Sequence, residues 1–194
     1  MACIHLVRHL ATEGAPATWL DRAGLQAWFD AEGARGITAG SRPSGPLVAA
    51  VAASRHLLVS PLERAQATAR SVLAARGPDA GPGPVVITDP DLIEIPLPVL
   101  PVPGVRLPLD AWDAACRTAW LLGYRGRIES RGEAVARARR AAERAAGLAE
   151  TGRVTVIGHG FTNILLARHL RRLGWRGPRL PDHRNGGLTS YRRP

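Results

Sequence analysis

Short apolar runs alternate with longer amphipathic segments along this chain. Four of the runs are continuous and rich in β-branched residues, and they cover residues 4–7, 57–59, 85–88 and 154–157. Runs of this length without polar alternation are typical of central strands covered on both sides, and helical patterns separate them here. The order of elements predicts an α/β fold: a three-layer α/β/α sandwich with a mainly parallel central sheet. Residues 188–191 are expected to add an edge strand.

Two of the predicted helices begin directly after strands. Ser60 is expected to cap the helix that follows the second strand, with Pro61 at its first position and Glu63 where a capping box needs an acid. Another helix is expected to open at Gly160 and to stop at Gly174. Because the amides at a helix N-terminus lack partners, this second helix would favour an anion at its start.

Two further helices are predicted over residues 109–122 and 133–149. The second has a narrow alanine stripe, as expected for a helix on the surface of the protein. Three arginines lie off that stripe, where solvent would surround them: Arg137, Arg140 and Arg144. A proline-rich, irregular run covers residues 96–108. The segment from residue 94 to about residue 131 is therefore interpreted as an insertion over the strand ends, within a single domain of residues 1–194.

Length and composition fit one globular domain. The 194 residues are 45% hydrophobic, which suffices for one sizeable core. No stretch approaches the roughly 20 apolar residues of a membrane span, and the start lacks a signal-type segment, so a cytoplasmic location is expected. Cys3 and Cys116 form neither a metal-type spacing nor a disulfide framework, and both are expected to be reduced and structural.

The formal net charge of +10 raises the question of nucleic-acid binding. All 26 basic residues are arginines, and they are dispersed through the predicted helices instead of forming a continuous basic tail. Aromatic residues suited to base stacking are few. This pattern argues against a nucleic acid as partner, although a basic exterior would steer anionic substrates toward the protein.

Histidine and arginine occur together where predicted strands end. Arg8 and His9 follow the first run, His159 follows the fourth, and Arg64 lies in the first turn after the second. Carboxyl ends of parallel strands share one edge of a sheet, so these side chains are expected in one pocket. A neutral imidazole can attack phosphorus, and guanidinium groups bind phosphate oxygens bidentately. The arrangement predicts phosphoryl transfer through His9, with no metal or other cofactor required.

The same segments resemble the signatures of the histidine phosphatase superfamily, also called phosphoglycerate mutase-like. Residues 8–12 (Arg-His-Leu-Ala-Thr) resemble its opening Arg-His-Gly-x-Thr, with Leu10 in place of the usual glycine. Residues 60–69 and 156–160 resemble the second and third signatures. All three occur in the order found in the family, so the resemblance extends over the whole chain.

The resemblance implies a phosphohistidine on His9, which water then hydrolyses to release inorganic phosphate. The phosphate pocket would be formed by Arg8, Arg64 and His159. Thr12 would either bind phosphate or tie down the loop after the nucleophile.

An acid must also protonate the leaving oxygen. In many members of the family this is a glutamate shortly after the third strand, and Glu94 resembles that position. Apolar neighbours would help its carboxyl group to hold a proton. Asp89, Asp91 and Glu13 are the competing candidates.

These expectations favour a phosphatase that hydrolyses a small phosphomonoester, with a small phosphorylated metabolite as its substrate. A phosphoglycerate-type mutase is a second interpretation, less favoured because that branch has longer chains. A third is a non-catalytic phosphate-binding or regulatory module that kept the pocket without turnover.

Overall fold

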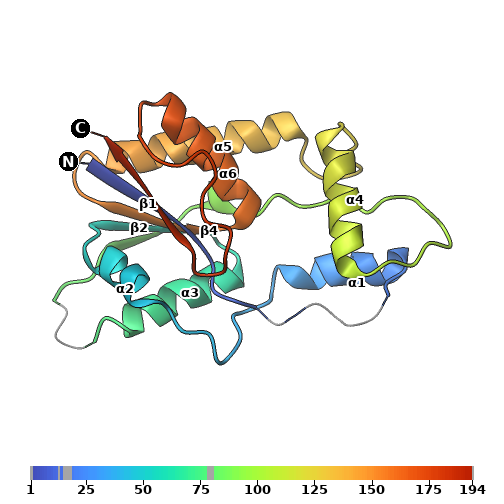
Figure 1. The fold of residues 1–194 in the computed structure, drawn as a ribbon, viewed down its shortest axis with the longest axis horizontal. Helices are drawn as coiled ribbons and strands as arrows, with labels where there is room; N and C mark the ends of the chain where they lie inside the picture. The colour runs from blue at the N-terminus through green and yellow to red at the C-terminus, as the bar shows by residue number, and fades with distance from the viewer. Residues whose placement is uncertain (1, 13, 15–18, 78–80, 194) are drawn as a thin grey trace.

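Five strands form one mixed sheet in the computed structural model, which describes residues 2–12, 14, 19–77 and 81–193 (Figure 1). The strands are β1 (Ala2–Arg8), β2 (His56–Val59), β3 (Val85–Thr88), β4 (Val154–Gly158) and β5 (Leu188–Arg193). They lie in the order β3-β2-β4-β1-β5. Only β5 runs antiparallel to its neighbour. All four predicted strands and the edge strand near the C-terminus are therefore confirmed.

Strand β3 was expected to be a central, covered strand. It lies instead at the edge of the sheet, and part of it is exposed to solvent. Within the described ranges it pairs only with β2. Val85 and Val86 are 58% and 48% exposed. Its composition matches that of the central strands, but β-branched residues suit any pleated surface and do not determine how many neighbours a strand has.

Helices cover both faces of the sheet and complete the three-layer α/β/α sandwich (Figure 1). They are α2 (Gly45–Ala52), α3 (Glu63–Ala74), α5 (Arg131–Leu148) and α6 (Gly160–Arg172). Helices α2 and α3 share one buried cluster with Val7 and Val59 of the sheet. Helices α5 and α6 share another with Ile4 and Leu58. Alternate residues of β1, β2 and β4 thus supply opposite layers, as the pleat requires.

Two helices stand apart from the sandwich and form a cap at one end of the molecule (Figure 1). They are α1 (Arg22–Glu32), which was not predicted, and α4 (Leu109–Leu121), which was. A small core of its own, centred on Leu25, Trp112 and Cys116, holds the cap together. Leu20 and Leu107 join the two segments by an isolated β-bridge. The cap therefore combines a segment of the predicted insertion with a distant part of the chain.

Helix α3 begins later than predicted, and Ser60 does not cap it. Its first helical residue is Glu63, and its N-cap, Leu62, makes no side-chain capping bond. The Ser60 hydroxyl lies instead 2.8 Å from Nε2 of His159, and Glu63 pairs with Arg70. A complete capping box does occur at the start of α5, between Ser130 and Glu133.

The arginines of α5 are also placed differently from the expectation. Arg137 is buried, with 8% of its surface exposed. Arg140 and Arg144 bind Asp91, and Arg144 also binds Asp89. Both acids belong to the turn around the short 3₁₀ helix η1 (Pro90–Leu92). Because these acids are distant in sequence from the arginines, the periodicity of the helix gives no sign of the ion pairs.

Both cysteines are free and buried. Burial raises the pKa of the Cys116 thiol, so this side chain has the character of an inert packing residue. Within the described part of the chain, no helix has the length and apolarity needed to cross a membrane.

Candidate active site

The carboxyl ends of β1, β2 and β4 bring two histidines together. The His9 amide donates to the Gly158 carbonyl at 3.0 Å, and the Ser60 amide donates to the Ile157 carbonyl at 3.0 Å, so the chain leaves all three strands at one edge. The ring centroids of His9 and His159 are 5.2 Å apart, with an angle of 56° between their planes. The convergence expected from the strand ends is thus present.

The His9 ring is held in one tautomer. Its Nδ1 lies 2.7 Å from the Leu10 carbonyl oxygen, which can only accept, so Nδ1 carries the proton. The lone pair is left on Nε2, which has no hydrogen-bond partner among the described residues. Burial, with smaller contributions from Arg64 and Arg8, lowers the pKa of His9 to about 4. The ring is therefore neutral at physiological pH, the form that a nucleophile requires.

Nitrogen-15 NMR of the histidine rings provides a direct check of this state. The His9 ring is expected to stay neutral, with its proton on Nδ1, from pH 8 down to about pH 5 in phosphate-free buffer. Since the unfolded ring has a pKa near 6.5, the stability contributed by the neutral ring is complete above that pH and is lost as the pH falls toward 4. A His9 midpoint near 6.5 in the folded protein would contradict this description.

The backbone and the space around Leu10 accommodate a leucine at the position where the Arg-His-Gly-x-Thr signature has glycine. Leu10 donates from its amide to Thr68 Oγ1 at 2.9 Å, and its carbonyl oxygen also accepts from Asn185 Nδ2 at 3.1 Å. No non-glycine residue in the described ranges has a positive φ, so this backbone does not need a glycine. Space for the leucine comes from Gly186, where a Cβ would lie 3.0 Å from Leu10 Cδ2. Asn185 was missed from the sequence, although the Asn-Gly-Gly run is a recognisable turn signal.

Two arginines flank His9 in the same cavity. Arg64 is buried; its Nε donates to His159 Nδ1 at 3.3 Å, and its Nη1 donates to the Glu32 carbonyl oxygen at 2.8 Å. The Glu32 carboxylate lies 3.5 Å from Arg64 Nη2. Arg8 donates from Nη1 to the His183 carbonyl oxygen at 2.6 Å, while its buried Nε has no partner in the part of the chain that the structure describes. Both guanidinium groups keep N–H groups that could bind an oxyanion.

His159 is fully buried and does not line the cavity as a free donor. Since Arg64 Nε donates to its Nδ1, the ring proton is on Nε2 and is directed to Ser60 Oγ. Burial, reinforced by the charge of Arg64, lowers the pKa of His159 well below its usual value. In this geometry His159 orients Arg64, and Ser60, which was predicted as a helix cap, fixes the ring of His159.

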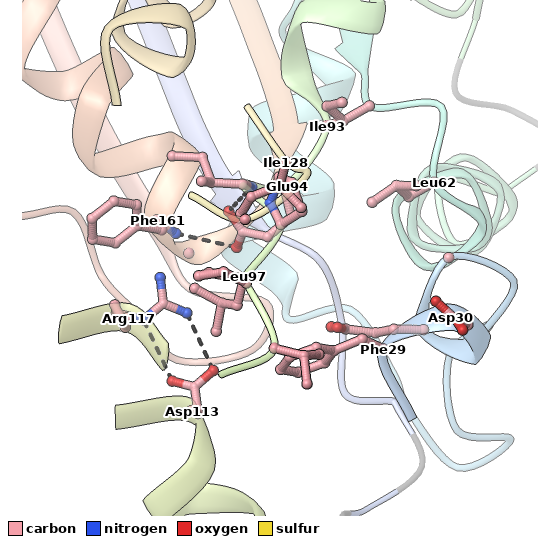
Figure 2. A pocket seen from close by; sticks show the side chains of 18 of the residues that line it. Phe29, Asp30, Leu62, Ile93, Glu94, Leu97, Asp113, Arg117, Ile128 and Phe161 are labelled. Atoms are coloured by element: carbon pink, nitrogen blue, oxygen red, sulfur yellow. Dashed lines mark hydrogen bonds and ion pairs between the residues drawn. The ribbon is translucent and has the colours of Figure 1, made fainter. Parts of the chain in front are cut away.

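Glu94 lies in the cavity and occupies the N-terminus of α6 (Figure 2). Its Oε1 accepts from the Thr162 amide at 3.1 Å and from the Ile95 amide at 2.9 Å, and its Oε2 accepts from the Phe161 amide at 3.2 Å. The amides expected to bind an external anion are thus occupied by an internal carboxylate, which the helix dipole favours. N–H groups therefore surround the carboxyl oxygens, in place of the apolar neighbours that the sequence suggested. One of those neighbours, Leu92, belongs to the buried core instead.

The other acids and Thr12 are placed elsewhere or lie outside the description. Hydrogen bonds from Arg140 and Arg144 outweigh the opposing effect of burial and lower the pKa of Asp91 below its usual value. Asp89 and Asp91 are both tied to α5 and do not line the cavity. Thr12 is likewise absent from the cavity lining, and the carbonyl oxygen of Ala11 before it accepts from the Thr38 amide at 2.8 Å. Glu13 lies outside the described residues.

Arg137 anchors the segment that carries Glu94. Its Nη1 donates to the carbonyl oxygens of Asp91 and Ile93 at 2.7 and 2.9 Å, and its Nε donates to Glu129 at 3.1 Å. The Thr162 hydroxyl donates to the same Ile93 oxygen at 2.8 Å. The residue preceding Glu94 is therefore held from both α5 and α6.

Arg137→Met is expected to lower the free energy of unfolding by about 3 kcal/mol, because it leaves Glu129 and two carbonyls without their buried donor. Urea denaturation measures this loss. Arg139→Met on the same helix is the matched control; it removes an exposed i,i+4 pair with Glu143 and should cost less than about 0.5 kcal/mol. Equal effects of the two variants would show that Arg137 is no anchor.

No group of three or more histidine, cysteine, aspartate or glutamate side chains suited to a metal ion occurs in the part of the chain that the structure describes. Around His9, the cavity brings together the Nε2 lone pair, the guanidinium groups of Arg8 and Arg64 and the carboxyl group of Glu94, and its lining also includes His183. This set can bind a dianionic oxyanion such as phosphate and place a nucleophile beside it.

Comparison with known proteins identifies the family of the chain and supports its fold. The sequence model of the histidine phosphatase superfamily (branch 1) matches residues 4–193. No curated protein matches the sequence. Among solved structures, a mycobacterial glucosyl-3-phosphoglycerate phosphatase is similar at 21% identity and a TM-score of 0.59, covering 98% of this chain and 89% of that one.

Two other solved structures have comparable similarity. An ecdysone phosphate phosphatase from Bombix mori has 17% identity and a TM-score of 0.57, covering 100% of this chain and 93% of that one. A phosphoserine phosphatase from Entamoeba histolytica has 18% identity and a TM-score of 0.52, covering 98% and 90%. At these identities the similarity establishes the fold alone.

Proposed function

Since this chain belongs to the histidine phosphatase superfamily, we propose that it is a metal-independent phosphatase that hydrolyses phosphomonoesters through a phosphohistidine on His9. One observation carries the proposal. The His9 ring is neutral and fixed through Nδ1, so the lone pair of Nε2 is available in a cavity that also contains Arg8 and Arg64. The substrate would be a phosphorylated small molecule.

The reaction would proceed in two displacements at phosphorus. His9 Nε2 attacks, the bond between phosphorus and the alcohol oxygen breaks, and Glu94 gives its proton to that oxygen. Water then attacks the phosphohistidine, Glu94 takes a proton from the water, and inorganic phosphate leaves with His9 neutral again. Glu94 thus acts first as acid and then as base, which returns the site to its starting state.

The contacts of Glu94 stabilise its carboxylate form, but they leave one of its oxygens with room for a proton. Oε1 accepts two amide hydrogen bonds and has the Thr162 hydroxyl at 3.1 Å. Among the described residues, Oε2 accepts only from the Phe161 amide. The second lone pair of Oε2 is therefore the place where the transferable proton would be held.

The arginines would bind the equatorial phosphoryl oxygens. Arg8 has a buried Nε without a partner, which an anionic oxygen would satisfy. Arg64 is oriented by His159 and by Glu32. Pre-oriented cations of this kind stabilise a transition state at little reorganisation cost. His159 would then act as a positioning residue for Arg64, with direct donation to phosphate only after its bond to Ser60 breaks.

Hydrolysis of a chromogenic aryl phosphate in the presence of a chelator tests the proposal. Turnover is expected without added metal and should be competitively inhibited by vanadate or inorganic phosphate. Phosphate binding without turnover would support the non-catalytic module instead. Interconversion of phosphoglycerates faster than release of phosphate would support the mutase. DNA affinity that has a steep salt dependence and persists in Arg8→Ala would support a nucleic-acid binder.

A further inference from the structure

The cavity at His9 is much larger than a phosphoryl group requires. Its volume is about 1540 Å³, and its lining includes residues of both cap helices, such as Phe29 of α1 and Arg117 of α4. Pockets for drug-sized ligands usually have volumes of roughly 300–1,000 Å³. The cavity therefore has room for a bulky group attached to the phosphate.

Beyond the phosphate cluster, the cavity lining mixes polar side chains with a group of apolar ones. Figure 2 shows Leu97 with Phe161 on one side and Phe29 on the other, and Ile128 belongs to the same lining. All four side chains are half-buried, so part of each remains open to the cavity. Apolar surface that is open in a cleft gains free energy when an apolar ligand covers it.

Several charged groups of this region already have partners. Arg117 pairs with Asp113 at 3.3 Å, and its guanidinium lies 4.8 Å from the centre of the Phe161 ring. Arg64 pairs with Glu32. These pairs reduce the demand for a substrate with complementary charges at those positions. Two other cations of the lining, Arg22 and Arg127, are exposed, so water can solvate them.

On the premise of the proposed function, we propose that the physiological substrate is the phosphate monoester of an apolar alcohol with an aryl, alicyclic or alkyl body. The phosphate would lie at His9 and Arg8, and the body would extend between the sheet and the cap against Phe29, Leu97 and Phe161. The cap is then the specificity element, because it supplies Phe29 and the walls that a sandwich alone would lack.

A series of primary alkyl phosphates tests this proposal, since ethyl, butyl, hexyl and octyl phosphate share one leaving-group chemistry and differ only in apolar length. The expected result is a kcat/KM that rises with chain length, by up to about fourfold for each methylene that becomes fully buried. Glucose 6-phosphate, which is bulky and polar, should be hydrolysed less efficiently than hexyl phosphate.

Two variants test whether the cap causes the dependence of kcat/KM on chain length. Phe29→Ala should flatten the dependence of kcat/KM on chain length. Leu122→Ala removes a side chain that is 84% exposed and does not line the cavity, and it should leave that dependence unchanged.

The wild-type series does not depend on the folding of any variant. Hydrolysis of all four alkyl phosphates at equal efficiency, or a preference for glucose 6-phosphate over hexyl phosphate, would overturn the proposed substrate class while leaving the phosphatase function intact. Absence of hydrolysis for every phosphate, the aryl phosphate included, would instead contradict the proposed function.

Discussion

His9→Ala is expected to lower kcat/KM for an aryl phosphate by on the order of 10⁴-fold or more, because removing a nucleophile leaves only binding and electrostatic stabilisation. Steady-state hydrolysis with a chromogenic substrate measures the loss. The variant should still bind inorganic phosphate, since the two arginines that flank His9 remain in the cavity.

His56→Gln is the matched control. His56 begins β2, at the opposite end of the strand from Ser60, and it is absent from the cavity lining. Its substitution should leave kcat/KM within about twofold, as expected for a site without contact to the reacting atoms. Comparable losses in both variants would point to misfolding, and retained activity in His9→Ala would exclude His9 as nucleophile.

Glu94→Gln is expected to lower kcat by about 10²- to 10⁴-fold for an alkyl phosphate but by less than about tenfold for a p-nitrophenyl phosphate. The reason is that an alkoxide needs a proton as it leaves, whereas a nitrophenolate leaves readily without one. Glutamine keeps an oxygen that can accept the Thr162 and Ile95 amides and loses the acceptor for the Phe161 amide, so most of the bonds at the start of α6 should stay intact.

The measurement is the dependence of kcat on the acidity of the leaving alcohol in wild type and variant. Glu63→Gln, an exposed acid at the start of α3, serves as the control and should not change that dependence. Equal loss for both kinds of substrate would assign Glu94 a structural role at the α6 terminus in place of proton transfer.

The strands and the meeting of His9 with His159 followed from the sequence because their causes are local. Continuous β-branched runs mark strands, and residues directly after parallel strands share one edge of the sheet. The start of α6 at Gly160 was predicted correctly for the same reason. No knowledge of distant contacts was needed for any of these conclusions.

Other features depend on partners that are distant in sequence. Ser60 has every local property of an N-cap, but its hydroxyl contacts His159, 99 residues away. Arg137 appears in the helical pattern as a solvated residue, yet it binds carbonyls of the Glu94 segment. Helix α1 was missed because its single buried residue, Leu25, is covered by the α4 segment and not by the sheet. Local patterns carry no information about these pairings.

Rapid quenching of the reaction with a ³²P-labelled substrate is the most direct test of the claim that His9 Nε2 accepts the phosphoryl group. We expect a labelled protein whose phosphoryl bond is labile in acid and stable in base, with the label on the peptide that contains His9 and absent in His9→Ala. Full turnover with no labelled enzyme on the millisecond scale, or label on another residue, would contradict it.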